Sequence, residues 1–269
     1  MGAASSSSPK SKSASRVSRP QPGSRAASRA RLGREHVVQA SLPFARNGWG
    51  GRRAGAGRKP RGERPLHTHT VRPLQCGRYP LHLTTKVRSG LPGLRRAGSH
   101  RLLLETLRAG SDRFGFRLIE FSVQSNHFHL LVEVTDRTAL TRGAKGLLVR
   151  LARHLNKHWG RTGQVFPDRF HVRTLRSPRE VRRALAYVLH NARRHGGFGN
   201  GIDPYSSGPW FEGFTAAGIA RALRIEFIRA MRMAPRPTCE ARCWLLLHGW
   251  RRAGLIQVDE RAAHWHEPA

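Results

Sequence analysis

Apolar and polar residues alternate in several stretches of the chain, which is typical of β-strands with one buried face. The segment PLHLTTKV at residues 80–87 predicts a first strand. Alternation returns over residues 116–124, and a turn at residues 125–126 leads into HFHLLVEV at residues 127–134. These two runs predict a β-hairpin, and residues 164–175, which contain FHVRTL, predict a fourth strand.

Other stretches repeat their apolar residues every three or four positions, as amphipathic helices do. Residues 99–113 predict one helix, and residues 137–160 predict a longer one whose outer face is basic. A third helix begins with SPRE at residues 177–180, where serine, proline and glutamate are spaced as in a capping box, and we expect it to end at Gly196 and Gly197. The order β-α-β-β-α-β-α predicts an α+β fold, a ferredoxin-like four-stranded antiparallel sheet with helices packed on it.

Composition divides the chain into three parts. Residues 1–64 contain 15 Lys and Arg but only two acidic residues, and they are rich in Ser, Gly, Pro and Ala, so we expect a disordered basic arm. Its arginines could enter a DNA minor groove or bind nucleic acid without sequence preference. Residues 65–200 hold the strands and helices above. Residues 201–269 predict an aromatic linker followed by a C-terminal extension with helices over residues 215–233 and 238–253.

The charge of the chain indicates a polyanionic partner. Its 269 residues include 49 Lys and Arg against 16 Asp and Glu, a formal net charge of +33. The longest uncharged run, residues 121–132, contains Gln, Ser, Asn and two His, so we expect no transmembrane helix. Three cysteines without a CxxC pair favour a reducing cytoplasm over a disulfide framework.

Two histidines offer a candidate metal site. His127 and His129 are two positions apart on the predicted strand, so their side chains leave the same face and could share a cation. The alternative is that both are half-exposed spacers, as two of the 15 histidines in the chain can easily be.

A tyrosine and an asparagine lie on one flank of the third helix. Tyr187 and Asn191 are four residues apart, one helical turn. Tyr187 could be a nucleophile that the rigid helix holds in position, or it could lie at the edge of the core with its hydroxyl in water. The chain has two other tyrosines: Tyr79 precedes a proline at a strand entry, and Tyr205 lies in a segment rich in Gly, Pro and Ser.

Together these motifs match a known family. VQSNHFHLLVEV, followed some sixty residues later by ALAYVLHNARRHG, resembles the HUH single-tyrosine transposases of the insertion sequence 200-like superfamily, especially their repetitive-palindrome-associated branch. The resemblance covers residues 65–196 and implies that residues 65–200 are a catalytic domain. It implies a bacterial, nucleoid-associated enzyme that nicks single-stranded or hairpin DNA and transfers the strand, either as a monomer or as a homodimer.

The resemblance also implies the role of each site residue. His127, His129 and Asn191 would bind Mg²⁺ or Mn²⁺, and Tyr187 would attack the phosphodiester to give a 5′-phosphotyrosine and a free 3′-OH. The relatives often carry Asn-Pro where this chain has Asn191 followed by alanine, and the neighbouring His190 could divert binding toward zinc.

Two other functions fit the same residues. The protein could be a domesticated relative that binds nucleic acid without cutting it, or a metal-dependent nuclease that uses water in place of Tyr187. The aromatic side chains of residues 205–214 could stack on unpaired bases or dock the extension onto the core, and Cys239 and Cys243 are expected to be packing residues.

Overall fold

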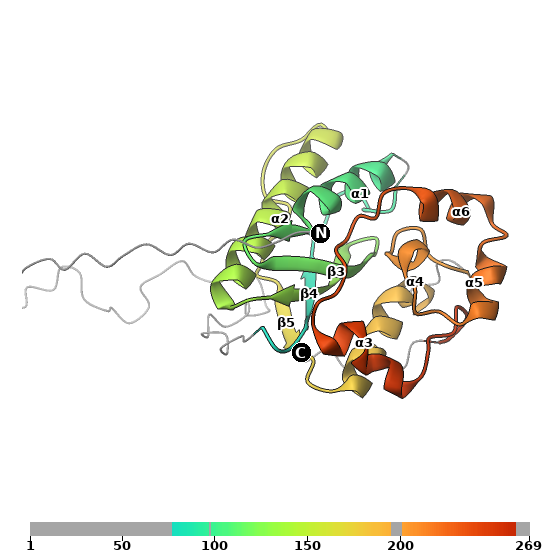
Figure 1. Ribbon diagram of the computed structural model, residues 1–269. Coiled ribbons are helices and arrows are strands. Elements are labelled where there is room, and N and C mark those ends of the chain that lie inside the picture. The colour runs from blue at the N-terminus through green and yellow to red at the C-terminus, as the bar shows by residue number, and fades with distance from the viewer. Residues whose placement is uncertain (1–76, 97, 195–200, 262–269) are drawn as a thin grey trace, which may run out of the picture. The chain divides into compact units, whose positions relative to one another are not determined.

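Five strands form one antiparallel sheet in the computed structural model, which describes residues 77–96, 98–194 and 201–261 (Figure 1). The strands are β1 (Leu81–Lys86), β2 (Asp112–Arg113), β3 (Phe116–Val123), β4 (His127–Val134) and β5 (His171–Thr174). Their spatial order is β2-β3-β4-β1-β5, which places β4 at the centre. The expected α+β class is confirmed, and the sheet has one more strand than the four expected.

Nine helices accompany the sheet in the described residues. They are α1 (Ser99–Gly110), α2 (Arg137–His158), α3 (Pro178–Leu189), α4 (Asn191–Arg194), η1 (Gly208–Trp210), α5 (Ala216–Ala222), α6 (Glu226–Met233), α7 (Trp244–Leu247) and η2 (Gly249–Ala253). None of them is long and apolar enough to cross a membrane. The boundary expected between residues 64 and 65 lies outside the described residues.

The extra strand, β2, comes from a tight hairpin that the sequence pattern does not reveal. Phe114 and Gly115 join β2 to β3, and both have positive φ, 57° and 75°. This conformation is common for glycine but rare for an aromatic residue, so the sequence carries no ordinary turn signal there. The ring of Phe114 is largely exposed, and the guanidinium of Arg142 lies over one face of it, 4.8 Å from its centroid.

The sheet separates two hydrophobic cores, because alternate residues of β4 point to opposite faces. Phe128, Leu130 and Val132 pack in the core beneath α1 and α2. Leu131 packs on the other face with Val181 and other residues of α3. Figure 1 shows α1 and α2 on one side of the sheet and α3 on the other. The same alternation places the side chains of His127 and His129 on the face that α3 covers.

Helix α2 lies so close to the sheet that one position on it must be glycine. A Cβ atom on Gly143 would meet Cβ of Phe116 at 2.1 Å. Asp136 begins the helix by accepting the N–H of Ala139 at 2.8 Å. Glycine is less favourable than alanine inside a helix, but here it permits close contact between α2 and β3.

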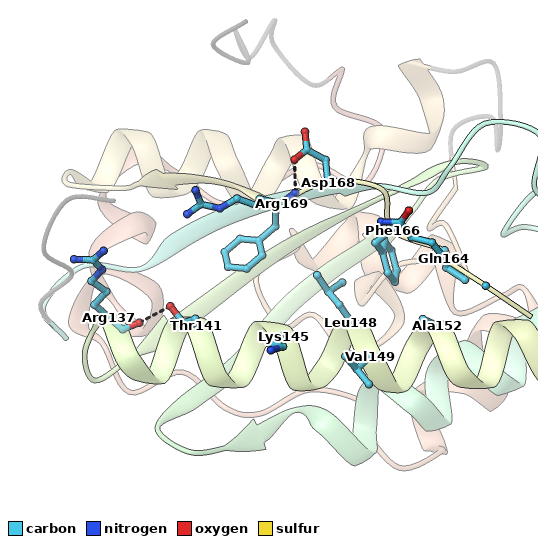
Figure 2. A pocket seen from close by; sticks show the side chains of 13 residues that line it. Arg137, Thr141, Lys145, Leu148, Val149, Ala152, Gln164, Phe166, Asp168 and Arg169 are labelled. Carbon is cyan, nitrogen blue, oxygen red and sulfur yellow. Dashed lines mark hydrogen bonds between the residues drawn. The ribbon is translucent and has the colours of Figure 1, made fainter. Parts of the chain in front are cut away.

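The strand expected over residues 164–175 forms only at its end, in β5. The reason is local: Pro167 has no amide donor, and the side chain of Asp168 accepts the N–H of Arg169 at 2.7 Å, so no strand partner receives it. Together with α2, residues 163–170 line a pocket of about 560 Å³ (Figure 2).

The C-terminal extension covers the α3 face of the sheet. Phe211, Phe214 and Trp250 are buried in one core with α3. The docking alternative is therefore correct for the aromatic segment, whose Trp210 is also buried.

The extension contains shorter helices than the two expected over residues 215–233 and 238–253. The first is divided into α5 and α6 by extended backbone at Ile225. The second begins only at Trp244, in α7, because the residues before it run along the sheet. There the carboxylate of Glu133 accepts the N–H groups of Arg242 and Cys243 at 2.9 and 2.8 Å. Both cysteines are half-buried and unpaired with each other, as expected for packing residues.

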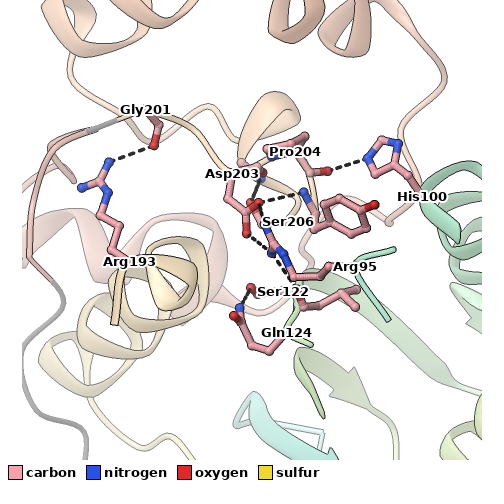
Figure 3. A network of polar contacts seen from close by, with 12 residues as sticks. Arg95, His100, Ser122, Gln124, Arg193, Gly201, Asp203, Pro204 and Ser206 are labelled. Atoms are coloured by element: carbon pink, nitrogen blue, oxygen red, sulfur yellow. Dashed lines mark hydrogen bonds and ion pairs between the residues drawn. The ribbon is translucent and has the colours of Figure 1, made fainter. Parts of the chain in front are cut away.

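A bidentate ion pair attaches the start of this extension to the loop after β1. Arg95 donates to both carboxylate oxygens of Asp203, at 2.8 and 2.7 Å, and its guanidinium lies 4.5 Å from the ring centroid of Tyr205 (Figure 3). Beside it, the carbonyl of Tyr205 accepts the N–H of Val123 at the end of β3. Residues 205 and 206 therefore pair with the end of β3, the strand that precedes the two histidines in the chain.

Candidate active site

The two histidines begin the central strand of the sheet. His127 is half-buried and His129 is fully buried, and their ring centroids are 4.7 Å apart. In the strand pairing, His129 lies between Ser122 of β3 and Thr84 of β1. The shared face expected from the HFH spacing is the face that α3 covers, and His129 contacts Tyr187 of that helix.

Tyr187 brings a phenol ring to the same place from α3. Its ring centroid is 5.1 Å from that of His129, in an edge-to-face arrangement, and the residue is 6% exposed. The helix that carries it begins as the sequence predicts: Ser177 and Glu180 form a capping box, with Pro178 in the first turn. The cap fixes the helix start, and the helical phase then turns Tyr187 toward the sheet.

Asn191 is fully buried at the first position of α4. The helix expected to continue to Gly196 is interrupted at His190, whose backbone is not helical, and α4 follows at once. Both polar atoms of the Asn191 carboxamide lack a hydrogen-bond partner among the described residues. Such atoms are costly to bury, so this side chain has the capacity to bind a further group.

His190 differs from its neighbour because it packs against the C-terminal extension. Its ring centroid is 5.9 Å from that of Phe214. Burial, and next the positive charge of Arg193, lower the pKa of His190 from 6.5 to about 4. The ring is therefore neutral at physiological pH.

A third histidine, His82 of β1, belongs to the cluster and was missed by the sequence analysis. Its Nε2 lies 3.2 Å from Nδ1 of His129, and its ring centroid is 5.9 Å from that of Tyr187. Burial, and secondarily the charge of Arg173, lower the pKa of His82 from 6.5 to about 3. Strand parity offered a signal: the alternation that buries Leu81 and Leu83 puts His82 on the other face, with Thr84.

The donor set suits a labile divalent ion. The described residues contain no group of three or more His, Cys, Asp or Glu side chains that could hold a metal ion. The candidate ligands instead combine two imidazoles, His127 and His129, with an amide, Asn191. The buried Asn191 carboxamide fits such a role because neither its oxygen nor its nitrogen has another partner among the described side chains.

Two pockets of the described surface lie away from the histidines. The pocket between α2 and residues 163–170 has apolar walls that include Leu148 and Phe166, with Lys145 beside them, and lies on the opposite face of the sheet from the histidines (Figure 2). A second pocket of about 720 Å³ lies near the start of α3, and its lining includes Arg179, Arg182, Arg183 and Arg252. Neither of these two pockets is lined by His82, His127 or His129.

Comparison with known proteins found a family model that matches the central part of the chain. Residues 78–191, less than half of the chain, match a family model described as "Transposase IS200 like". The match spans both histidines, Tyr187 and Asn191. A comparison with curated proteins gave no match.

Two solved structures are similar over part of their length. One is a REP-associated tyrosine transposase bound to a REP hairpin, with 16% identity, a TM-score of 0.42, and coverage of 58% of this chain and 87% of that one. The other is a putative transposase from Deinococcus radiodurans R1, with 22% identity, a TM-score of 0.31, and coverage of 36% and 78%. Both TM-scores are too low to equate individual positions of the chains.

Proposed function

We propose that residues 78–191, which match the IS200-like transposase model, form a domain that nicks and rejoins single-stranded or hairpin DNA through Tyr187. The observation that carries the proposal is the meeting of three side chains from two elements. His127 and His129 come from β4 and Tyr187 from α3, with 4.7 Å between the two imidazole centroids and 5.1 Å between His129 and Tyr187.

His127, His129 and Asn191 would hold a Mg²⁺ or Mn²⁺ ion. Such an ion, when bound, polarises a nonbridging phosphoryl oxygen and favours the phenolate form of a neighbouring tyrosine. A ligand set of two imidazoles and one amide is neutral, so it binds a divalent ion less tightly than carboxylates or thiolates do. Such weak binding suits an ion that exchanges readily, or one for which the DNA phosphate would supply a further ligand.

Tyr187 supplies the nucleophile. Its phenol oxygen forms a bond to phosphorus while the bond from phosphorus to the 3′ oxygen breaks; the phenol proton goes to solvent, and the 3′ oxygen takes up a proton and leaves as a 3′-OH. The 5′-phosphotyrosine conserves the energy of the phosphodiester. Attack by another 3′-OH reverses the step, releases the tyrosine and joins a new strand.

DNA is the partner that the charge of the chain favours. The net charge of +33 is spread over the arm, the outer face of α2 and the arginines of the C-terminal extension. We expect the protein to act at the bacterial nucleoid, and a homodimer would allow α3 of one copy to serve the histidines of the other.

A second function, DNA binding without cleavage, is favoured by one observation. Tyr187 is only 6% exposed, as a tyrosine at the edge of a core would be. Under this alternative the histidines and Tyr187 stabilise the fold, and the basic surfaces do the binding.

One experiment distinguishes the two functions. Labelled single-stranded hairpin DNA is incubated with Mn²⁺ or EDTA and with the parent, Tyr187→Phe or His127→Ala protein, and the products are separated on denaturing gels. We expect a covalent protein-DNA adduct from the parent with Mn²⁺ only, and none from either variant. Binding of the hairpin by all three proteins without any cleavage would support the noncatalytic function.

The remaining outcomes identify other chemistry. An adduct that persists in Tyr187→Phe would move the nucleophile to Tyr205 or Tyr79. Cleavage by the parent without an adduct would indicate a metal-dependent nuclease that uses water.

A further inference from the structure

Two side chains of β1 hold one ring nitrogen of His129. Nδ1 of His129 lies 3.2 Å from Nε2 of His82 and 3.2 Å from Oγ1 of Thr84. All three residues are at least nine-tenths buried. The contacts follow from the strand register, in which Thr84 pairs with His129 and His82 is two residues before it on the same face.

This arrangement bears on the tautomer of His129. A neutral imidazole carries its hydrogen on one nitrogen and offers the other as an acceptor or a metal ligand. If Nδ1 of His129 carries the hydrogen, it can donate to the Thr84 hydroxyl or to Nε2 of His82, and Nε2 of His129 is left able to bind a metal. If Nε2 carries the hydrogen, it cannot bind one.

His127 has an equivalent arrangement. Its Nδ1 lies 2.7 Å from Oδ1 of Asn126, and a carboxamide oxygen only accepts hydrogen bonds. The hydrogen of a neutral His127 is therefore on Nδ1, which leaves Nε2 as the nitrogen able to bind a metal. Both histidines thus use Nδ1 for a protein contact, as metal-binding histidines commonly do.

We propose that Thr84 and His82 are positioning residues, which fix His129 in the tautomer with the hydrogen on Nδ1 and so make its Nε2 available to the divalent ion. This inference rests on the metal-dependent function proposed above. Thr84 accepts the hydrogen through its hydroxyl, and His82 accepts it through Nε2, which requires His82 to carry its own hydrogen on Nδ1. Neither residue touches the ion.

The tautomer can be measured without DNA or metal. In protein labelled with ¹⁵N at histidine, the ring nitrogen shifts of metal-free His129 should show the hydrogen on Nδ1. Thr84→Val, which removes the hydroxyl and keeps the shape, should give a mixture of tautomers. A parent protein with the hydrogen on Nε2 of His129 would overturn the proposal, and this measurement needs no variant to fold.

The affinity for Mn²⁺ gives an independent test by calorimetry on the full chain. Thr84→Val and His82→Leu should each weaken binding by about 10- to 100-fold, the usual effect of removing a group that orients a metal-binding histidine. Thr84→Ser and His82→Gln keep an acceptor near the same position and should retain the parent affinity. Equal affinities in Thr84→Val, His82→Leu and the parent would refute the positioning role.

The two measurements separate this inference from the function on which it rests. A parent protein that binds no Mn²⁺ would contradict the proposed metal site. In that case the ring nitrogen shifts alone decide the role of Thr84 and His82: hydrogen on Nδ1 that is lost in Thr84→Val supports it, and shifts unchanged by Thr84→Val argue against it.

Discussion

The imidazole of His129 meets the phenol ring of Tyr187 edge to face, with 5.1 Å between the ring centroids. One residue comes from the centre of the sheet and the other from the helix that packs over it. Their contact brings the two sequence motifs of the domain together, and it predicts that changes to the two residues affect stability differently.

Replacing Tyr187 with Phe removes only a hydroxyl. The ring keeps its packing against His129 and His82, so the free energy of unfolding in urea should change by no more than about 1 kcal/mol. Hairpin binding should also persist, whereas the covalent adduct should be absent. A Tyr187→Phe protein that unfolds at a much lower urea concentration than the parent would contradict this expectation.

Replacing His129 with alanine should lower the stability of the fold more than replacing His127. His129→Ala empties a fully buried position, so it should destabilise the protein by about 2–4 kcal/mol in urea unfolding, besides removing a proposed metal ligand. His127→Ala, at a half-buried position, should cost less than about 1 kcal/mol and still abolish cleavage. Similar unfolding curves for the two variants would show that His129 is less tightly packed than the structure indicates.

Two glycines of α2 form a matched pair. A Cβ on Gly143 would overlap the Phe116 side chain, so Gly143→Ala should destabilise the domain by about 1–3 kcal/mol. A Cβ on Gly146 would meet nothing within 4 Å among the described residues, so Gly146→Ala should stabilise the helix by up to about 1 kcal/mol. Thermal unfolding of both variants tests this, and destabilisation by Gly146→Ala would contradict it.

Glu120 should make stability depend on pH. Burial raises its pKa from 4.5 to about 7, although Arg236, at 3.1 Å, opposes the shift. Below the unfolded value the group is protonated in both states and costs nothing. As the pH rises from about 4.5 to about 7 the unfolded state loses the proton first, so the protein loses stability, and above about 7 the cost is constant.

Glu120→Gln should remove this part of the pH dependence and should be more stable than the parent above about pH 7, in urea unfolding measured across the range. Glu105→Gln is the matched control substitution, because it removes an exposed carboxylate that pairs with Arg101 on the surface. A pH profile of Glu120→Gln that matches the parent would contradict the raised pKa.

Deleting residues 1–64 removes a net charge of +13, from 15 basic and two acidic residues. Fewer counterions should then be released from DNA, so hairpin affinity should fall and its dependence on salt concentration should become less steep. The position of cleavage should not change. If the shortened protein did not fold, the expected boundary at residue 65 would be wrong.

The sequence by itself determined the features that depend on neighbouring residues. Strand alternation places His127 and His129 on one face, the SPRE capping box begins α3, and helical periodicity puts Tyr187 and Asn191 one turn apart. Each of these follows from backbone geometry over a few residues, which the order of residues fixes directly.

Only the tertiary structure decided which distant residues complete the site. His82 and His129 are 47 residues apart, and their contact depends on the register between β1 and β4, which no local pattern specifies. The same is true of Glu133, whose carboxylate binds backbone N–H groups more than 100 residues away and so delays the last helices of the extension. Long-range pairing is set by the packing of the whole domain, because each such contact gains its free energy only when both segments are already folded.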